Sequence, residues 1–280
     1  MYKIIEKESL NTAVFKMKIE APLIAKKAEP GQFIILRVTE NSERIPLTIS
    51  DYDREAGLVT IIVQTVGGTT EELSHKNAGE YIQDFVGPLG AATHTDGIRK
   101  AAIIGGGVGC AIAYPVAKKL KELGAQVHSV IGFRTKELVI LEEEFSKISD
   151  KLCLVTDDGS YGQKGLVTNA LKELIEGGEE YDEVIAIGPL IMMKFVAKLT
   201  KEYGIKTIVS MNPIMIDGTG MCGGCRLSVG GETKFACVDG PDFDGHLVDF
   251  EEAMDRGAMY KNFEREAHEE VCNLYKKGDQ

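Results

Sequence analysis

Three of the six cysteines stand close together in a glycine-rich part of the chain. Cys222 and Cys225 form a Cys-x2-Cys pair, and Cys237 follows after eleven intervening residues. Thiolates are soft ligands that bind both iron–sulfur clusters and zinc. A zinc ribbon normally adds a second Cys-x2-Cys pair or two histidines, whereas the only nearby histidine is His246. The spacing therefore favours an iron–sulfur cluster, with a structural zinc site as the alternative.

A [2Fe–2S] cluster needs four ligands, and this segment supplies three thiols. Plant-type ferredoxins use Cys-x4-Cys-x2-Cys followed by a distant cysteine, and Asp217 stands at the first position of that spacing. Because a carboxylate can ligate iron, the sequence predicts a [2Fe–2S] cluster held by Asp217, Cys222, Cys225 and Cys237. The alternative is that Asp217 is a solvated loop acid and that Cys272 or an outside group supplies the fourth ligand.

A second candidate site consists of three loops that each follow a short apolar strand. Gly105–Gly109 lies between a strand and a helix, where glycines let the backbone approach a pyrophosphate and the helix N-terminus offers free N–H groups. Its spacing meets the GxGxxG fingerprint only in part. With the loops Asp157–Gly162 and Gly188-Pro189 it predicts a nucleotide-binding crevice at the carboxyl edge of a parallel sheet. The expected contacts are Gly106, Gly107, Val108, Gly109, Asp157, Asp158, Gly159, Ser160, Gly188 and Pro189.

The residue that follows the next expected strand bears on which nucleotide binds. No acid is present there to hold a ribose 2′-hydroxyl; the chain continues with Gly132 to Lys136, which includes Arg134. By the rule for dinucleotide folds, an arginine here suggests a 2′-phosphate, so NADP(H) stays possible beside NAD(H).

A third candidate site lies in the N-terminal part. The run Arg44–Ser50 places hydroxyls beside an arginine and a proline, and Gly67–Thr70 is a backbone-exposing turn with two threonines, able to hold a phosphate. Taken alone, these residues also fit an ordinary hairpin.

The elements that must position these residues fall into three parts. Residues 1–95 are expected to form an antiparallel β-barrel, with strands at Ala13–Ile19, Gln32–Val38, Leu58–Gln64 and Tyr81–Val86. Residues 96–210 alternate strands and helices, which predicts a doubly wound parallel sheet. Its strands are expected at Ala101–Ile104, Gln126–Ile131, Leu152–Thr156, Glu183–Ile187 and Ile205–Val209, and its helices at Ala111–Leu123, Leu138–Ile148, Gly165–Glu176 and Met192–Tyr203.

Residues 211–280 form the third part. Asp217–Gly245 reads as too irregular for a helix or a packed strand, so it is expected to be the cluster loop segment. Asp249–Lys277 is charged and predicted to be helical.

Composition narrows the possible functions. The 280 residues carry a formal net charge of −11, which argues against nucleic acid as a partner. No apolar run approaches the roughly 20 residues of a membrane span, and the first residues lack the features of a signal peptide, so no membrane insertion and a cytoplasmic location are expected. Cys110, Cys153 and Cys272 are expected to be small buried residues.

The order of these motifs, from the barrel through Gly87–Gly90 to the nucleotide domain, resembles the ferredoxin–NADP reductase superfamily. The resemblance implies FAD in the barrel, with Thr48 as the catalytic residue beside flavin N5 and Pro46 and Leu47 along the isoalloxazine. It implies that Gly68, Thr69 and Thr70 contact the phosphates. Arg44 stands one residue before the family's arginine position, so its role on the pyrophosphate is left open. The remaining flavin contacts expected from the resemblance are Ile49, Val63 and Gln64.

The C-terminal segment resembles the electron-transfer subunit of bacterial dihydroorotate dehydrogenase. Asp217 replaces a cysteine of that family, and Ile187 stands where the superfamily often has a cysteine before Gly-Pro. The runs Asn212–Arg226 and Phe235–Pro241 look closer to the small subunit of the NADH-dependent reduced ferredoxin:NADP oxidoreductase, or sulfide dehydrogenase, branch, whose members are similar in having an aspartate cluster ligand.

This second resemblance implies an oxidoreductase subunit that takes hydride from NAD(H) to FAD and passes single electrons to a [2Fe–2S] cluster. It implies a larger partner subunit that carries FAD and [4Fe–4S] clusters, ferredoxin reached through the complex, and electron bifurcation. The alternatives are an electron-transfer subunit of dihydroorotate dehydrogenase, a sulfide dehydrogenase (polysulfide reductase) subunit, and a non-enzymatic zinc-ribbon module.

Overall fold

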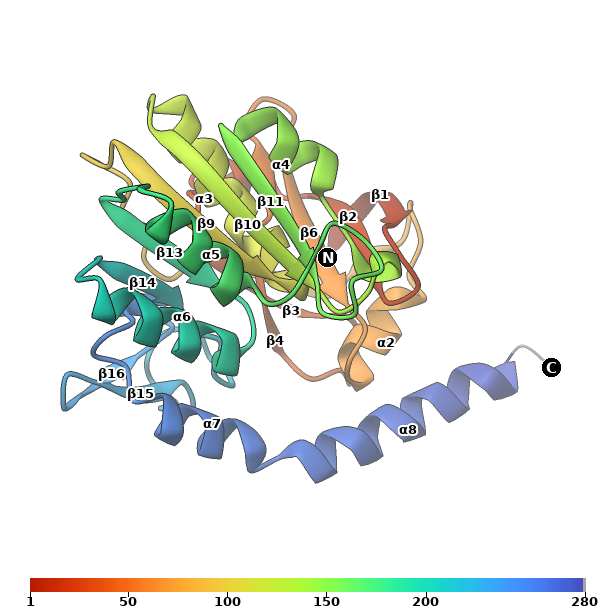
Figure 1. Cartoon of the computed structure of the whole chain (residues 1–280). Coiled ribbons are helices and arrows are strands. Elements are labelled where there is room, and N and C mark those ends of the chain that lie inside the picture. Colours follow the sequence, from red (N-terminus) through yellow and green to blue (C-terminus); the bar gives the residue numbers. More distant parts are fainter. Residues whose placement is uncertain (279–280) are drawn as a thin grey trace.

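The computed structural model describes residues 1–278 and has a β-barrel, a parallel sheet flanked by helices, and a C-terminal segment that ends in a long helix (Figure 1). The fold class predicted from the sequence is confirmed. The predicted boundary at residue 95 falls in the connection between the last barrel strand, which ends at Leu89, and the first sheet strand, which begins at Lys100.

The barrel is built from two antiparallel sheets around one core, in the strand orders β5-β6-β2-β1-β7 and β4-β3-β8. Along β2, Met17 and Ile19 are buried while Lys16 and Lys18 form ion pairs outside, as expected for a strand with one solvated face. The strands are β1 (Tyr2–Ser9), β2 (Val14–Glu20), β3 (Phe33–Arg37), β4 (Ile45–Thr48), β5 (Asp51–Asp53), β6 (Leu58–Gln64), β7 (Tyr81–Ile82) and β8 (Asp84–Leu89), joined by the helices α1 (Pro22–Ala25) and α2 (Gly68–Ser74).

Two details of the barrel differ from the sequence prediction. The stretch Tyr81–Val86, expected to be one strand, is divided between β7 and β8, which belong to different sheets. The turn expected at Gly67–Thr70 is the start of α2, with Gly67 at the N-cap and the Thr70 hydroxyl closing the first turn.

The nucleotide domain is a seven-stranded sheet in the order β12-β11-β10-β9-β13-β14-β17, parallel except for its last strand. Ala101 and Ile103 of β9 face one hydrophobic core, and Ala102 and Ile104 face another, so the sheet is covered on both sides. The strands are β9 (Lys100–Gly106), β10 (Gln126–Phe133), β11 (Lys151–Thr156), β12 (Gln163–Lys164), β13 (Glu183–Ile187), β14 (Thr207–Ser210) and β17 (Asp242–Asp244).

The helices of this domain lie on opposite faces of the sheet. α3 (Cys110–Glu122) and α4 (Glu142–Ile148) cover one face, and α5 (Val167–Glu176) and α6 (Leu190–Glu202) cover the other. Gly124 adopts φ +87° just after α3, the left-handed conformation in which glycine commonly ends a helix. Short 3-10 turns, η1 (Gly107–Gly109) and η2 (Lys136–Leu138), precede α3 and α4.

The barrel and the sheet share their hydrophobic cores. Val14 and Ile62 of the barrel belong to the core beneath α3, and Phe33 and Ile35 belong to the core beneath α5 and α6. The two domains are therefore packed against each other through buried apolar side chains on both faces of the sheet.

The C-terminal segment is more ordered than the sequence indicated. The expectation that residues 217–245 hold no packed strand is wrong, because β15 (Arg226–Val229) and β16 (Glu232–Phe235) form a hairpin and β17 (Asp242–Asp244) joins the nucleotide sheet beside β14. The glycines that suggested an irregular loop instead form its turns, since Gly230 and Gly231 have positive φ between the two hairpin strands.

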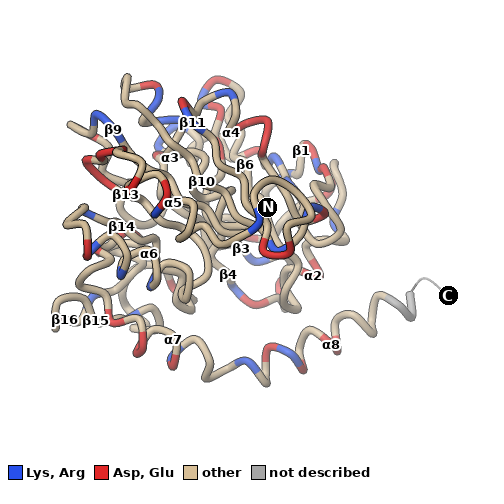
Figure 2. Tube along the Cα trace, in the orientation of Figure 1, with Lys and Arg blue, Asp and Glu red and all other residues tan. Residues whose placement is uncertain are grey.

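The charged C-terminal stretch forms two helices, α7 (Phe250–Ala258) and α8 (Lys261–Gly278). Asp249 caps α7, since its carboxylate accepts the Glu252 N–H at 3.0 Å. Charged residues of both signs follow one another along both helices (Figure 2), and α8 extends below the barrel until it lies against α2 (Figure 1). In residues 1–278, none of the helices combines the length and apolar character that crossing a bilayer requires.

One buried carboxyl joins the barrel to the sheet. Asp242 of β17 accepts a hydrogen bond from the Thr93 hydroxyl at 2.5 Å, while within residues 1–278 its other oxygen is buried without a partner. Burial, opposed by bonds from Thr93 and Ser210, raises the pKa of Asp242. A folded-state pKa above the unfolded value favours folding at low pH, and this contribution is lost as the pH rises through the folded-state pKa.

We therefore expect Asp242→Asn to stabilise the protein at pH 7 by roughly 1 kcal/mol, because it removes a buried charge, and the gain should shrink as the pH falls toward 4. Asp182 is the matched control, since backbone N–H groups of Arg99 and Lys100 lower the pKa of its carboxyl. Asp182→Asn should destabilise at pH 7. Denaturant unfolding of both variants at several pH values measures this, and a gain for Asp242→Asn that grows at low pH would contradict the assignment.

Candidate cofactor and metal site

The cluster loop, defined here as residues 216–225, and the end of the β15–β16 hairpin carry the four predicted cluster ligands. Cys225 and Cys237 are buried at 1% and 2% exposure, whereas Cys222 is exposed. The Ala236 N–H donates to the Cys225 carbonyl at 3.1 Å, which joins the two cysteine-bearing segments next to their thiols. The two thiols are neighbours, since Cys225 contributes to the raised pKa of Cys237.

Backbone N–H groups of the loop point toward the sulfurs, as the glycine-rich sequence predicts. The Gly224 N–H lies 3.5 Å from Cys222 Sγ and is the main reason that the pKa of this thiol is lowered. Burial, and then the neighbouring thiol of Cys225, raises the pKa of Cys237 to about 11, although the Gly220 N–H opposes this. Two buried thiols beside an exposed one form a group of soft donors that suits a bound metal centre.

Asp217 is held in an ionised, acceptor state at the start of the loop. One carboxylate oxygen accepts the N–H groups of Thr219 at 2.9 Å and Met221 at 3.4 Å and also the Thr219 hydroxyl. The Thr219 hydroxyl, followed by these N–H groups and the Arg44 charge, lowers the pKa of Asp217. An ionised carboxylate and three thiols form an O,S3 donor set compatible with iron.

The four donors spread over the loop rather than surrounding one point. Within residues 1–278, no three of Asp217, Cys222, Cys225 and Cys237 have ligand atoms within 4.8 Å of one another. A [2Fe–2S] cluster divides its four ligands between two irons, so this spread fits a binuclear centre.

Two arginines that sequence reasoning missed hold the loop from the other side. Arg226 donates to the Gly223 carbonyl at 3.1 Å, and Arg256 of α7 donates to the Gly224 carbonyl at 3.2 Å. Both line a cavity of about 310 Å³ that opens beside Cys222. Their charges favour an anionic centre next to the loop. Arg226 could have been noticed because it directly follows Cys225, but nothing in the sequence places Arg256 here.

The cluster loop rests on the three-stranded sheet of the barrel. A Cβ on Gly218, whose φ is +85°, would lie 2.8 Å from side-chain carbons of Ile35 and Leu89, so only glycine allows this approach. Arg44 donates from Nε to the Ile216 carbonyl at 2.9 Å. Arg44, which the sequence associated with flavin, therefore connects β4 to the cluster loop.

The strand with the expected flavin contacts is the neighbour of the strand that supports this loop. In the β3–β4 pair, Pro46 is opposite Ile35 and Thr48 is opposite Phe33. Pro46, Leu47 and Thr48 are all half-buried.

The other expected flavin contacts are divided between the core and the surface. The side chains of Ile49 and Val63 are 1% exposed and pack in the barrel core, so they could reach a ligand only through their backbones. Gln64 is exposed at the end of β6. The three predictions remain untested as cofactor contacts.

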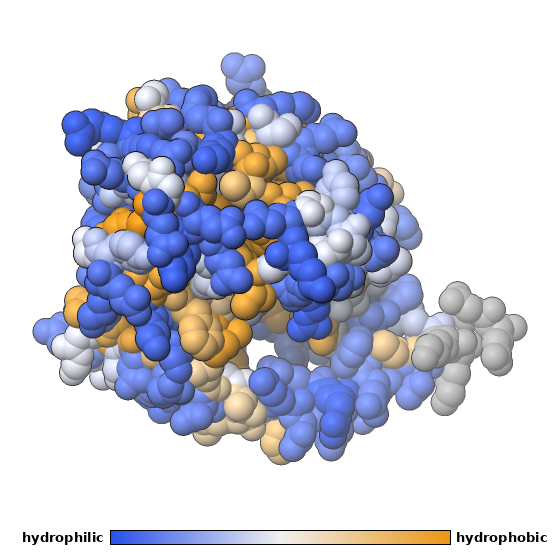
Figure 3. Space-filling view, viewed as in Figure 1, coloured by the Kyte–Doolittle hydropathy of each residue, from blue (hydrophilic) through white to orange (hydrophobic). Residues whose placement is uncertain are grey.

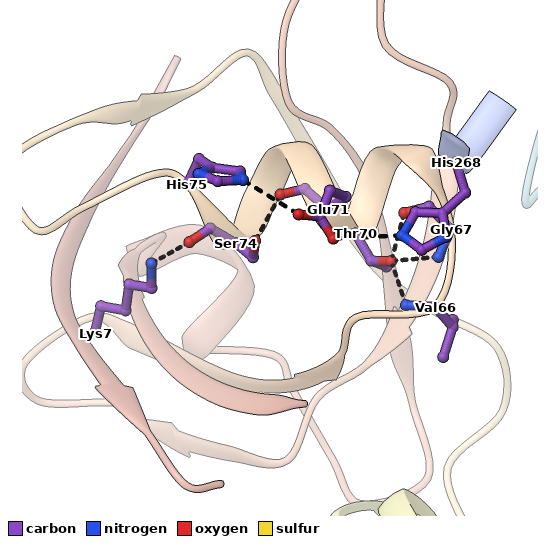
Figure 4. A network of polar contacts seen from close by, with 8 residues as sticks. All are labelled: Lys7, Val66, Gly67, Thr70, Glu71, Ser74, His75 and His268. Atoms are coloured by element: carbon purple, nitrogen blue, oxygen red, sulfur yellow. Dashed lines mark hydrogen bonds and ion pairs between the residues drawn. The ribbon is translucent and has the colours of Figure 1, made fainter. Parts of the chain in front are cut away.

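The expected phosphate turn has a defined shape at the start of α2. The Thr70 hydroxyl accepts the N–H groups of Val66 and Gly67, both at 2.9 Å, and donates to the Gly67 carbonyl (Figure 4). Thr70 thereby fixes the turn, while Gly68 and Thr69 stand in the first turn of the helix, where N–H groups have no partner within the helix.

The nucleotide loops meet at one edge of the parallel sheet. Gly106 and Gly188 approach so closely that a Cβ on Gly188 would lie 3.1 Å from the Gly106 Cα, and a Cβ on Gly109 would lie 2.4 Å from the Ile187 carbonyl oxygen. The glycines are thus required for packing between the loops that follow β9 and β13. Gly107 adopts φ +55° with open space around it, and Val108 and Pro189 belong to the same two loops.

The loops after β10 and β11 are joined by hydrogen bonds. Asp158 accepts the N–H and the hydroxyl of Ser160 at 2.9 and 2.7 Å, and the Ser160 hydroxyl in turn accepts the Lys136 N–H at 2.9 Å. The backbone N–H groups of Asp157 and Asp158 donate to Phe133 and Arg134 carbonyls. Arg134, in the loop after β10, and Gly159, in the loop after β11, are both exposed. The predicted nucleotide contacts therefore lie along the carboxyl edge of the sheet.

The expectation that the remaining cysteines are buried is only partly right. Cys110 is buried, but Cys153 and Cys272 are partly exposed.

The contact between Arg44 and the cluster loop can be tested directly. Arg44→Gln should accelerate amide hydrogen exchange of residues 216–221 about fivefold, because a partly exposed hydrogen bond from a charged donor contributes about 1 kcal/mol. Arg54→Gln, which breaks a surface pair with Glu29, serves as the control and should leave this loop unchanged. Equal exchange in both variants would show that Arg44 does not hold the loop.

Comparisons with known proteins agree with this arrangement. Residues 212–249 match the family described as the iron–sulfur cluster binding domain of dihydroorotate dehydrogenase B, and residues 103–198 match the oxidoreductase NAD-binding domain. A Thermotoga maritima homologue of the dihydroorotate dehydrogenase B electron transfer subunit is 48% identical over 95% of this chain and 94% of its own length. The electron transfer subunit of Geobacillus thermodenitrificans is 32% identical over 86% and 94%.

Comparison with solved structures agrees with these sequence matches. A chain from the structure of the NADH-dependent reduced ferredoxin–NADP oxidoreductase, described in terms of flavin-based electron bifurcation, has a TM-score of 0.92 and 45% identity, covering 97% of this chain and 98% of its own. A cytochrome P450 reductase from Amycolatopsis shares the fold at a TM-score of 0.61 and 21% identity, covering 72% and 65%. The expected NAD-binding domain and iron–sulfur segment are confirmed, and the chain belongs to the family of dihydroorotate dehydrogenase B-type electron transfer subunits within the ferredoxin–NADP reductase fold.

Proposed function

We propose that this chain is the NADH-oxidising subunit of a heteromeric, electron-bifurcating NADH-dependent ferredoxin:NADP oxidoreductase. When bound, FAD supplies a carrier that accepts hydride from NADH, and a [2Fe–2S] cluster supplies a carrier of single electrons. The protein's own contribution is to bind and orient these groups and to keep them close together.

The observation that carries this proposal is the position of the cluster loop against strands β3 and β8 of the barrel. Gly218 touches the β3–β8 side of the sheet whose β4 strand holds Pro46, Leu47 and Thr48. A cluster bound by Asp217, Cys222, Cys225 and Cys237 would therefore lie one strand away from a flavin bound along β4. Thr48 is proposed as the residue whose hydroxyl faces the reactive edge of that flavin.

The nucleotide edge supports a nicotinamide dinucleotide as the electron donor, and NAD(H) is proposed because of the resemblance to the NADH-dependent branch. Gly106, Asp158 and Gly188 lie at the carboxyl ends of β9, β11 and β13, along the edge where parallel sheets bind nucleotides. Arg134 is exposed at this edge and could receive a 2′-phosphate, so NADP(H) is the second nucleotide to be assayed.

The surroundings of the cluster loop support a partner protein. Met221 is 88% exposed, and Ile216 and Val238 are about half exposed next to it. Figure 3 shows hydrophobic side chains in the middle of the viewed face, among hydrophilic ones and above the mostly hydrophilic α7 and α8. Exposed apolar residues around an electron-carrying loop favour docking of another subunit; we propose a larger flavoprotein with FAD and [4Fe–4S] clusters, through which electrons reach ferredoxin and NADP.

The electron-transfer subunit of an NAD-dependent dihydroorotate dehydrogenase is the second candidate. The matched cluster-binding family and the relative from Geobacillus thermodenitrificans favour it. Purification with the native partner, followed by assays with NADH, NADPH, ferredoxin and dihydroorotate, separates the two. Oxidation of dihydroorotate without any ferredoxin reaction would replace the first proposal with the second.

The separation of the cofactor sites leads to a prediction for Cys225→Ala. This variant should lose iron and acid-labile sulfide yet keep its flavin absorbance and NADH-driven dye reduction within about twofold, because Cys225 lies on the cluster loop and the flavin contacts lie on the barrel. Cys153→Ser, at a partly exposed thiol outside these sites, should keep both cofactors. Loss of flavin together with the cluster would argue against separate sites.

The ligand role of Asp217 is tested by Asp217→Cys. A thiolate donates more charge than a carboxylate, so the variant should assemble a cluster whose visible and electron paramagnetic resonance spectra and potential differ from those of the wild type. Asp239→Cys, at an acid near Cys237 that accepts the Phe235 N–H, is the control for adding a thiol nearby. Spectra that do not change in Asp217→Cys would remove this residue from the ligand set.

A further inference from the structure

The C-terminal helix contacts the barrel at α2, beside the turn that is expected to contact the flavin phosphates. α8 lies against α2, where the rings of His75 and Tyr275 stack with centroids 3.8 Å apart and an angle of 9° between their planes. A Cβ on Gly68 would lie 3.3 Å from the Val271 side chain. This contact brings residues nearly 200 positions apart in sequence within reach of each other.

Three metal-ligating side chains converge in this contact. A carboxylate oxygen of Glu71, a ring nitrogen of His268 and the sulfur of Cys272 all lie within 4.8 Å of one another, and all three residues are half-buried. His268 and Cys272 are four residues apart on α8, so they lie on the same face of the helix. Among residues 1–278, this is the one group of three or more such donors that lie this close together.

We propose that Glu71, His268 and Cys272 form a binding site for a divalent transition metal of the zinc class, which fastens α8 to α2. In a tetrahedral zinc site with bonds of about 2.0–2.3 Å, neighbouring ligand atoms lie roughly 3.3–3.7 Å apart. His268 Nε2 lies 3.4 Å from Glu71 Oε2, which is long for a hydrogen bond but matches that spacing. The mixed O,N,S set suits zinc, whereas calcium and magnesium prefer oxygen ligands alone.

A further histidine holds the carboxylate in place. His75 Nε2 lies 3.2 Å from Oε1 of Glu71, the oxygen that does not face His268, so the carboxylate stands between two imidazoles (Figure 4). A carboxylate ligand whose second oxygen is hydrogen-bonded is oriented before the metal arrives. His75 is therefore assigned as a positioning residue for Glu71.

The charges around the site favour a cation. Burial raises the pKa of Tyr275, and the carboxylates of Glu72, Glu71 and Glu80 raise it further, which shows that acids surround this end of α8. The nearby cation Lys7 is turned to the Ser74 carbonyl, as Figure 4 shows. Three protein ligands leave a fourth position for water.

The site is distinct from the proposed iron–sulfur centre and has its own consequence. Cys272 lies beside α2, while the cluster loop lies against β3 and β8. A metal here would hold α8 over Gly68, at the turn expected to contact the flavin phosphates, even if that flavin assignment proved wrong.

The test uses the full chain with its cofactors as purified, treated with a chelator, exchanged into metal-free buffer and titrated with zinc chloride. Iron and acid-labile sulfide are measured in parallel so that zinc bound by cluster cysteines is recognised. We expect about one zinc per chain, measured by plasma mass spectrometry, and protection of Cys272 from alkylation. Glu71→Gln, His268→Ala and Cys272→Ser should each weaken zinc binding at least tenfold, and His75→Ala should weaken it less.

Cys153→Ser is the matched control, because it removes another partly exposed thiol away from the site, and it should bind zinc like the wild type. Glu71→Gln and Cys272→Ser change few atoms, so circular dichroism should confirm that both are folded. The proposal is overturned if the chain takes up no zinc at tenfold molar excess. It is equally overturned if zinc binding survives all three ligand substitutions or if Cys272 is alkylated at the same rate with and without zinc.

Discussion

The absence of a side chain at residue 218 allows the cluster loop to pack closely against the barrel. Gly218 lets the cluster loop approach the side chains of Ile35 and Leu89 to a distance that any Cβ would prevent. Arg44 then joins the same loop to the neighbouring strand. Since electron transfer between cofactors requires short distances, the proposed chemistry depends on this close approach of the thiol-bearing loop to β3 and β8, because β3 is the neighbour of β4, the strand proposed to hold the flavin.

The nucleotide domain is built on a related constraint. Gly106, Gly109 and Gly188 pack backbone against backbone at the carboxyl edge of the sheet, so the loops after β9 and β13 form one continuous surface. Side chains contribute on the other half of the edge, where Ser160 bridges Asp158 and the Lys136 N–H. The result is an edge where helix N-termini and backbone N–H groups are available to an anionic ligand, in front of the largely buried central strands β9, β10 and β13.

Much of this arrangement follows from the sequence because the signals are local. Alternating apolar residues set the strands, and glycines after Ile104 and before Ala125 mark a tight turn and a helix end. The Cys-x2-Cys pair with Asp217 five residues earlier identifies the cluster loop. Contacts between distant segments were not predictable: Arg256 reaches the Gly224 carbonyl from a helix that reads only as charged, and β17 becomes a strand because β14 offers it a free edge. The half-buried state of Cys153 and Cys272 likewise depends on packing that no local pattern encodes.

The shared cores of the barrel and the sheet bear on how a nucleotide could enter. Phe33 and Ile35 on one side, and Val14 and Ile62 on the other, belong to hydrophobic clusters of the nucleotide domain. Swinging the two domains apart would expose these side chains to water at about 25 cal/mol for each Å² of apolar surface. Hinge opening between the domains is thus disfavoured, so under the proposed function a nicotinamide ring would reach the barrel through rearrangement of loops and side chains at the carboxyl edge of the sheet.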